Sequence, residues 1–156
     1  SILQQVLKAR DRLEADYNIA ADVWSVTSFT ELRRDALDAE RWNMLHPDET
    51  PRQTYVGECL KDEAGGVFVV ATDYIKALPD GISRWIPGEW VPLGTDGFGR
   101  SDTREALRDF FEIDDRYITV AALTGLARQG TVDNAAIAKA ISDLGINPQK
   151  MNPQNS

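Results

Sequence analysis

Residues 67–71, Val-Phe-Val-Val-Ala, are apolar at every position, so a strand formed here would have two apolar faces. Antiparallel strands at a surface commonly alternate polar and apolar side chains, whereas strands of parallel sheets are covered by helices on both faces. Gly65 and Gly66 precede the run and favour a turn that leads into it. The run therefore predicts a central strand of a mostly parallel sheet with helices on both sides.

Two other stretches have the composition of strands. Residues 22–26 are rich in Val and Trp, and residues 90–93 form a second short strand in which a proline favours an edge position. Ser28 and Glu31 have the spacing of a capping box, which predicts a helix over residues 29–45. A strand, a short turn and a capped helix in this order are typical of an α/β protein.

The C-terminal half alternates turns and helices. Asp114 is suited to cap a helix, and residues 117–128 are apolar almost all round, which predicts a buried helix. Residues 147–156 are polar and contain two prolines, so we expect an extended or frayed tail. The sequence thus predicts a single α/β domain over residues 1–146, followed by a polar C-terminal tail.

Charge and cysteine content exclude several classes of function. The chain has 25 acidic and 17 basic residues and a formal net charge of -8, and no basic patch is visible. This balance repels phosphate backbones and anionic membranes, so we expect no nucleic acid and no membrane as a partner. Cys59 is the only cysteine, which excludes a disulfide framework and favours a reducing, cytoplasmic location. The longest apolar run, residues 64–71, is much shorter than the roughly 20 residues of a membrane-spanning helix.

The start of the chain favours a larger parent. Ser1 enters a helical pattern directly, with no initiator Met and no basic segment followed by an apolar one, so no signal peptide is expected. We interpret this start as a cut within a longer polypeptide.

The glycine-rich segment 94–101, Gly-Thr-Asp-Gly-Phe-Gly-Arg-Ser, lies between a predicted strand and a predicted helix, a place where anions can bind. Its spacing matches neither the dinucleotide-binding motif nor the phosphate-binding loop, and Asp96 puts a negative charge where a phosphate would lie. We therefore expect a structural turn whose glycines allow positive φ, and an anion site that includes Arg100 is the alternative.

The remaining polar residues do not form a recognisable active site. His46 is the only histidine and lies beside Pro47 in a charged loop, so we expect a surface residue rather than a catalyst. Cys59 has little nearby positive charge, so we expect an inert thiol that is buried or half-buried. Arg33 and Arg34 are expected to pair with acidic residues of their own helix, with a subunit contact as the alternative. Adjacent carboxylates are expected to be solvated or to cap helices; they are Asp48 and Glu49, Asp62 and Glu63, and Asp114 and Asp115. We predict no catalytic, cofactor-binding or metal-binding residue in the chain.

Long stretches of the sequence match one known family in the same order. They are residues 22–35, residues 40–47 (Glu-Arg-Trp-Asn-Met-Leu-His-Pro), residues 71–74, residues 93–102 (Leu-Gly-Thr-Asp-Gly-Phe-Gly-Arg-Ser-Asp), and residues 120–123 and 126–127. Nearly the whole chain resembles the C-terminal domain of the homodimeric type of pyruvate dehydrogenase E1, a member of the transketolase-like, thiamine diphosphate-dependent enzymes.

The resemblance implies a parent enzyme that decarboxylates pyruvate on thiamine diphosphate with Mg²⁺ and transfers the acetyl group to a lipoyl group. In such enzymes the cofactor lies between the first two domains, where a Gly-Asp-Gly motif and a later Asn pair bind the diphosphate. Here Thr95, Asp96 and Gly97 stand in place of that motif, and there is no Asn pair, so no catalytic residue is transferred. The implied role is to support domain and dimer packing, with the other E1 domains, the second E1 subunit and the lipoyl-bearing E2 component as partners. The alternative is a free-standing α/β binding or scaffold domain without activity.

The resemblance also implies a three-layer αβα fold with a mostly parallel sheet of about five strands. We expect that sheet to include residues 22–26, 67–72 and 90–93, and a further strand near residues 116–121. Periodicity alone predicts a helix at the last of these, but the β-branched residues there and the resemblance favour the strand, which we adopt.

Asp96, Phe98 and Arg100 are the candidate interface or anion-binding residues. Phe98 lies between two glycines, which leave it little local structure to pack against, and Arg100 is suited to pair with a carboxylate across an interface. The competing hypothesis places the Phe98 ring in the core beneath the loop.

Overall fold

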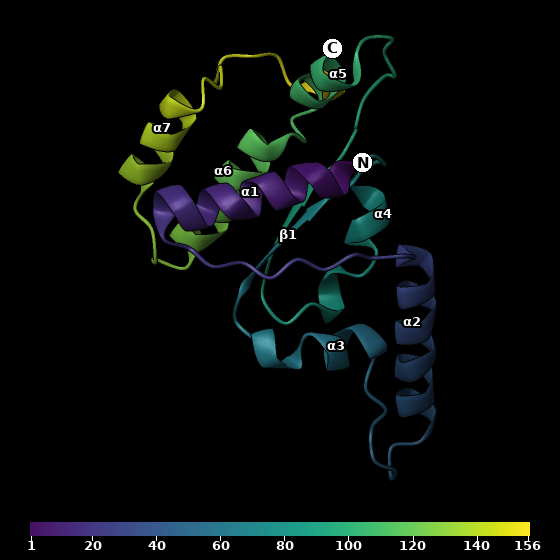
Figure 1. The fold of residues 1–156 in the computed structure, drawn as a ribbon. Helices are drawn as coiled ribbons and strands as arrows, with labels where there is room; N and C mark the ends of the chain where they lie inside the picture. The colour runs from purple at the N-terminus through teal and green to yellow at the C-terminus, as the bar shows by residue number, and fades with distance from the viewer.

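A computed structural model describes all of residues 1–156 and consists of helices around a small sheet (Figure 1). The α-helices are α1 (Ile2–Tyr17), α2 (Phe29–Leu45), α3 (Tyr55–Cys59), α4 (Ala77–Asp80), α5 (Arg104–Phe110), α6 (Asp115–Arg128) and α7 (Asn134–Asp143). The strands are β1 (Val67–Ala71) and β2 (Glu89–Leu93), and the short 3₁₀ helices are η1 (Lys61–Glu63), η2 (Ser83–Trp85) and η3 (Pro153–Asn155).

The two strands form a parallel sheet. Their register runs from Val67 opposite Glu89 to Ala71 opposite Leu93. The predicted strands at residues 67–72 and 90–93 are therefore confirmed, each with a boundary one residue different. The proline of β2 is tolerated because β2 lies at an edge of the sheet.

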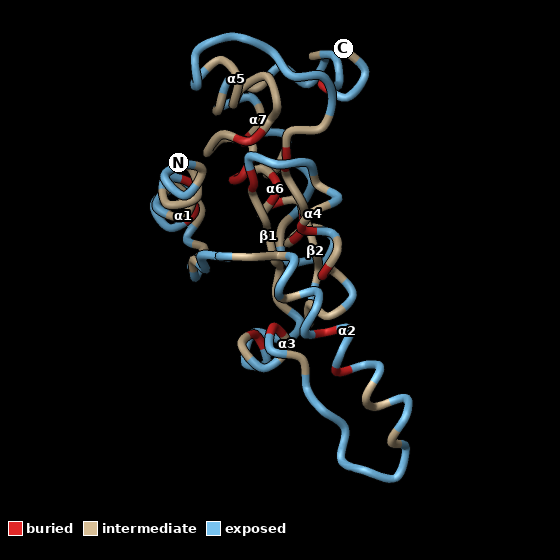
Figure 2. Tube along the Cα trace, turned by 90° about the vertical axis from the view of Figure 1, so that its right-hand side faces the viewer, coloured by how far each residue is buried: buried red, intermediate tan, exposed pale blue.

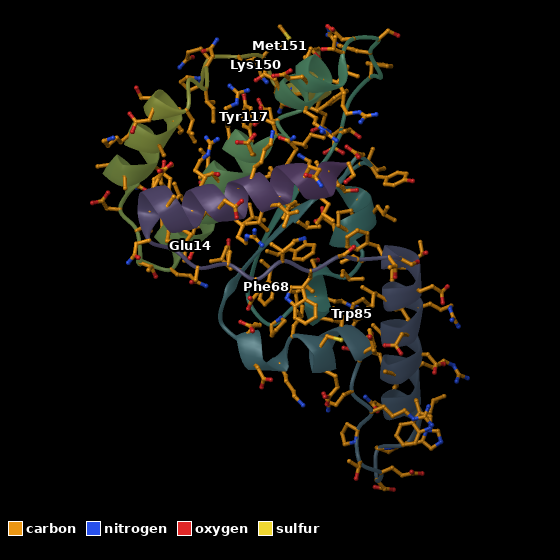
Figure 3. All side chains as sticks on the ribbon, in the orientation of Figure 1. Glu14, Phe68, Trp85, Tyr117, Lys150 and Met151 are labelled. Atoms are coloured by element: carbon orange, nitrogen blue, oxygen red, sulfur yellow. The ribbon has the colours of Figure 1, made fainter.

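Helices cover both faces of the sheet. On one face Gly125 of α6 lies so close to Val67 that a Cβ atom at position 125 would come within 2.3 Å of the Val67 Cγ1 atom. On the other face Phe68 joins an apolar cluster that includes Val56 of α3 and Trp85 of η2 (Figure 3). The prediction of a strand with helices on both sides is confirmed for β1.

Two apolar clusters stabilise the fold, one on each side of the sheet. The first connects α1, α6 and α7 through Leu13, Leu123, Ala140 and the adjoining Tyr17, Ile19, Ala122 and Ile137. The second connects α2, α3 and the sheet through Val56, Leu60, Ile82 and the adjoining Phe29, Leu32, Cys59, Phe68, Trp85, Ile86 and Trp90.

The chain exposes more surface than its mass requires. Its accessible surface is 9764 Å², whereas a folded monomer of this mass is expected to expose about 7,900 Å². Much of α2 is exposed and only two of its residues, Ala36 and Ala39, are buried (Figure 2). Leu37, Met44 and Leu45 of α2 are among the exposed large apolar side chains. This excess favours a domain that packs against further protein.

The expected strand at residues 22–26 is wrong. This segment is extended between α1 and α2, and the backbone of residues 20–27 makes no backbone hydrogen bond. A strand requires a neighbour that satisfies its N–H and C=O groups, and no neighbouring strand is present here. The sheet accordingly has two strands and not about five.

The expected strand near residues 116–121 is also wrong, because these residues form the first half of α6. The Asp114 carboxylate accepts hydrogen bonds from the backbone N–H groups of Arg116 and Tyr117 and so caps the helix. The Thr119 hydroxyl donates to the Asp115 carbonyl oxygen at 2.8 Å, which lets this β-branched residue sit inside a helix without an unpaired polar group. Capping by Asp114 and the burial of Ile118, Thr119 and Ala121 outweigh the local β propensity.

The C-terminal tail, which we expected to be extended or frayed, is mostly exposed but is attached to the domain at Lys150 and Pro153. Residues 153–155 form η3, and Pro153 is buried. The side chain of Lys150 reaches the carbonyl groups at the end of α5. The polar composition of residues 147–156 did not indicate these contacts, because each of them joins residues far apart in the sequence.

Candidate functional site

Two loops follow the carboxyl ends of β1 and β2, the edge at which open parallel sheets commonly bind their ligands or partners. The loop after β1 includes Tyr74, and the glycine-rich segment 94–101 follows β2. The backbone N–H of Thr95 donates to the Tyr74 carbonyl oxygen at 2.9 Å, and the Thr95 hydroxyl donates to the Asp73 carbonyl oxygen at 3.0 Å. The two loops are therefore held together as one structure.

Asp96 completes the joint between the loops. Its carboxylate accepts a hydrogen bond from the Lys76 backbone N–H at 3.0 Å and pairs with the Lys76 Nζ atom at 3.0 Å. Gly94 is buried beside them, and a Cβ atom at this position would lie 2.6 Å from the Tyr74 carbonyl oxygen. The sequence therefore needs glycine at position 94 because two backbones approach closely there. The negative charge of Asp96 therefore has a partner within the chain.

Large apolar side chains on these loops are open to solvent. Phe98 is 81% exposed, and Tyr74 and Ile75 are exposed as well. This exposure contradicts the alternative in which the Phe98 ring fills the core. We call Tyr74, Ile75 and Phe98 the loop patch. Exposed apolar patches are typical of surfaces that bind another protein.

Arg100 lies at the far side of the glycine-rich segment, over an aromatic ring. Its guanidinium carbon is 4.1 Å from the centre of the Phe110 ring, a cation–π contact. The two side chains border a hollow of about 300 Å³ whose lining also includes Ser101 and Asp102. The Asp102 carboxylate offsets the positive charge of Arg100 in this hollow, so the geometry does not favour a dedicated anion site. Thr103, rather than the neighbouring Asp102, caps the short helix α5.

His46 has a structural environment at the end of α2. Its ring stacks on Trp42 with 4.3 Å between ring centres, and its Nδ1 atom lies 2.8 Å from the Trp42 carbonyl oxygen. The guanidinium of Arg52 lies 4.1 Å from the centre of the Trp42 ring. His46 therefore packs against the last turns of α2. Cys59 is half-buried beside the second cluster, which agrees with the burial predicted for this thiol.

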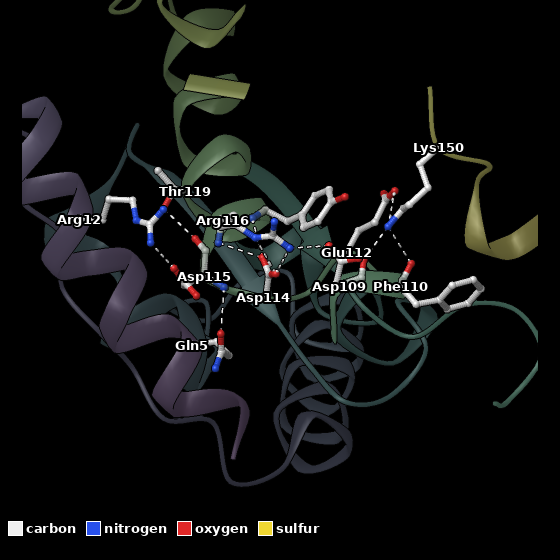
Figure 4. A network of polar contacts seen from close by, with 11 residues as sticks. Gln5, Arg12, Asp109, Phe110, Glu112, Asp114, Asp115, Arg116, Thr119 and Lys150 are labelled. Carbon is white, nitrogen blue, oxygen red and sulfur yellow. Dashed lines mark hydrogen bonds and ion pairs between the residues drawn. The ribbon is translucent and has the colours of Figure 1, made fainter. Parts of the chain in front are cut away.

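The adjacent carboxylates of Asp114 and Asp115 have separate partners. Asp114 caps α6 and binds Arg116, and this hydrogen bonding raises the pKa of the Arg116 guanidinium. Asp115 accepts from Arg12 of α1 at 2.5 Å, so α1 is attached to the start of α6 (Figure 4). Arg34 pairs with Glu31 at 2.5 Å inside α2, which confirms the predicted intrahelical pairing for Arg34.

The sequence interpretation overlooked Tyr74, Ile75 and Lys150. The signal for the first two was their position directly after a buried strand, where a loop at the carboxyl edge of the sheet is expected. Lys150 gave no local signal because its partners lie on α5 and the α5–α6 turn.

No group of three or more His, Cys, Asp or Glu side chains is placed to hold a metal ion. None of the helices combines the length and the apolar character needed to cross a membrane. The prominent chemical feature is thus the loop patch on its hydrogen-bonded support.

Comparison with known proteins agrees with a domain role. Residues 1–114 match the family model of the transketolase-like C-terminal domain. The chain is 50% identical over 154 residues to the pyruvate dehydrogenase E1 component of Pseudomonas aeruginosa, covering 98% of this chain and 17% of that protein. It is 48% identical over 155 residues to the pyruvate dehydrogenase E1 component of Escherichia coli strain K12, covering 99% of this chain and 17% of that protein. The chain therefore spans about one sixth of the length of these relatives.

Proposed function

The chain belongs to the transketolase-like C-terminal domain family, and we propose that it is the supporting, non-catalytic last domain of a pyruvate dehydrogenase E1 component. Residues 1–146 form that α/β domain in this proposal, and residues 147–156 are its C-terminal segment. The parent would carry out thiamine diphosphate-dependent decarboxylation of pyruvate with reductive acetylation of a lipoyl group. The identity to E1 components over nearly the whole chain supports this assignment.

The observation that supports a docking role is the loop patch. Three exposed apolar side chains lie on two loops whose backbones are hydrogen-bonded to each other. The hydrogen bonds of Thr95 and Asp96 fix the bases of the two loops before a partner binds, which lowers the conformational entropy lost on docking. We assign the patch to contact with the other domains of the same E1 chain or with the second subunit of a homodimer, because the relatives contain far more chain than is present here.

Thiamine diphosphate and Mg²⁺ are assigned to the rest of the parent. The residues at the glycine-rich segment do not fit the diphosphate, because the Asp96 carboxylate is already paired with Lys76. The Arg100 guanidinium lies over the Phe110 ring. We derive no catalytic step in this domain and expect the isolated chain to be inactive. The lipoyl-bearing E2 component and a cytoplasmic location belong to the same proposal.

The test compares the isolated chain with the full-length parent enzyme, each carrying Phe98→Ala. Truncation of an exposed ring should change the unfolding free energy of the isolated chain by less than about 0.5 kcal/mol. In the parent it should weaken subunit association, measured by sedimentation, and lower pyruvate decarboxylation in proportion. Tyr55→Ala, which removes an exposed aromatic side chain at the start of α3, serves as the matched variant outside the loops.

Three outcomes would contradict the proposal. A loss above about 2 kcal/mol in the isolated chain would place the Phe98 ring in the core. Unchanged association of the Phe98→Ala parent would remove the docking role. Binding of thiamine diphosphate to the isolated chain with a Kd tighter than about 1 mM would contradict the assignment of the cofactor to other domains.

A further inference from the structure

The C-terminal tail contacts both the glycine-rich segment and the end of α5. In Figure 1 the chain ends beside α5, and the hydrogen bonds of Lys150 confirm that proximity. The tail was expected to be frayed, so its ordered contacts need a physical explanation.

Lys150 forms the first anchor of the tail. Its Nζ atom donates to the carbonyl oxygens of Asp109 at 2.5 Å and Phe110 at 3.2 Å, and lies 3.5 Å from the Glu112 Oε1 atom (Figure 4). The two carbonyls are the last of α5, where the helix dipole favours a positive charge. All three donors of the ammonium group can thus be used at one place.

The backbone of Glu112, in the turn between α5 and α6, has an unusual conformation. Its φ of 62° is in the left-handed region, which non-glycine residues seldom adopt. This residue forms the turn between α5 and α6, and Lys150 neutralises its carboxylate. The Lys150 ammonium also lies 5.0 Å from the centre of the Tyr117 ring. The tail is therefore fixed to the α5–α6 turn by several different interactions.

Pro153 forms the second anchor, against the glycine-rich segment itself. Pro153 is buried, and a Cβ atom on Gly97 would come within 2.5 Å of the Pro153 carbonyl oxygen and 3.1 Å of its carbonyl carbon. Gly97 also has a φ of 111°, a conformation that side-chain-bearing residues rarely adopt. The backbone of the segment that presents Phe98 thus rests directly on the backbone of the tail.

From these two anchors we propose that residues 147–156 are a brace that sets the conformation of the glycine-rich segment, with Lys150 and Pro153 as positioning residues. Lys150 fixes the tail to α5, and the carbonyl group of Pro153 packs against Gly97. This contact keeps the side chain of the adjacent Phe98 exposed to solvent. Met151, also exposed, lies between the two anchors and adds an apolar side chain to the same end of the molecule. The consequence for assembly of the parent rests on the proposed function, whereas the brace is a property of this chain alone.

Limited digestion of the 156-residue chain with trypsin tests the brace. The rate of cleavage after Arg100 is measured relative to cleavage after Arg128, an exposed residue at the end of α6. Gly97→Ala should raise this ratio about tenfold or more, because opening of the segment becomes easier when the tail is displaced. Gly99→Ala is the matched control, since position 99 has open space around it and no positive φ.

A second pair of variants covers the case in which Gly97→Ala fails to fold. Lys150→Met keeps most of the alkyl stem and removes the charge, and should raise the same ratio about fivefold. Lys139→Met removes an exposed ammonium that pairs within α7 with Asp143 and should leave the ratio unchanged. A ratio for Gly97→Ala equal to that of Gly99→Ala, with no response to Lys150→Met, would overturn the brace. Equal acceleration at Arg100 and Arg128 would also overturn it, because the tail would then be an ordinary part of the core.

Assembly of the parent carrying Gly97→Ala separates this inference from the proposed function. Faster cleavage after Arg100 with normal association would support the brace and contradict the docking role of the loop patch. Normal cleavage after Arg100 in the Gly97→Ala chain, together with weakened association of the Phe98→Ala parent, would support the docking role and contradict the brace.

Discussion

β1 and residues 20–27, which we call the linker, are both extended, but their surroundings differ. β1 pairs with β2 along its length. One face of β1 packs against α6, and on the other face its residue Phe68 packs against the second apolar cluster. The linker makes no backbone hydrogen bond, and Trp24 and Val26 in it are 57% and 41% exposed. An extended conformation alone therefore does not make a strand. A strand also needs a neighbouring strand that pairs with its backbone groups and further elements that cover its side chains.

The linker is fixed only at its ends. Ile19 packs in the first apolar cluster and Phe29 in the second, so the linker spans from one side of the sheet to the other. Figure 2 shows it as an exposed connection between α1 and α2. The difference between β1 and the linker predicts that equivalent substitutions will have very different costs.

The largest effect is expected for Phe68→Ala in β1. This ring fills the space between the sheet and the second cluster, so its removal should lower the unfolding free energy by about 3 kcal/mol. Denaturant unfolding followed by tryptophan fluorescence measures the loss. A change below about 1 kcal/mol would mean that the face of β1 opposite α6 is not tightly packed.

The next effect concerns the other face of β1. Gly125→Ala places a methyl group against Val67 and should cost about 2 kcal/mol through overpacking. The double variant Gly125→Ala with Val67→Ala should recover much of that loss, because the smaller side chain leaves room for the methyl group. Additive losses in this double-mutant cycle would contradict direct contact between α6 and β1.

A third substitution examines why the β-branched residues Ile118, Thr119 and Val120 are helical. Asp114→Ala removes the cap of α6 and should lower the unfolding free energy by about 1 kcal/mol. Asp114→Asn is the matched control, because Asn also caps helices well and lacks only the charge that binds Arg116. Equal losses for both variants would assign the effect to the ion pair with Arg116 rather than to capping.

These comparisons explain which features could be predicted from sequence. The capping of α2 by Ser28 depends on residues three positions apart and was predicted correctly. The cap of α6 at Asp114 is just as local, but the prediction set it aside in favour of a strand, which was wrong. The two-sided apolar run of β1 correctly indicated helices on both faces. Strand pairing at residues 22–26 and the Lys150 contacts depend on residues distant in sequence, so local patterns could not determine them.

The candidate site was predictable to the same extent. The sequence identified the glycine-rich segment, and the positive φ expected of its glycines is present at Gly97. The pairing of Asp96 with Lys76 and the approach of Pro153 to Gly97 needed the folded chain. The prediction that Asp96, Phe98 and Arg100 form an interface therefore still depends on the experiments with the parent enzyme.

The smallest effect is expected for Trp24→Ala in the linker. The indole is more than half exposed and its backbone has no hydrogen-bond partner, so the unfolding free energy of the isolated chain should change by less than about 0.5 kcal/mol. Trp24→Ala and Phe68→Ala both remove an aromatic side chain from an extended backbone. The ratio of their losses in unfolding free energy therefore measures how much strand pairing and packing against helices contribute. In the full-length parent, where the proposed function has further protein packed against this domain, Trp24→Ala should lower the Tm more than it does in the isolated chain. A loss near that of Phe68→Ala in the isolated chain would show that the linker is packed like β1, and the contrast between the two regions would then be lost.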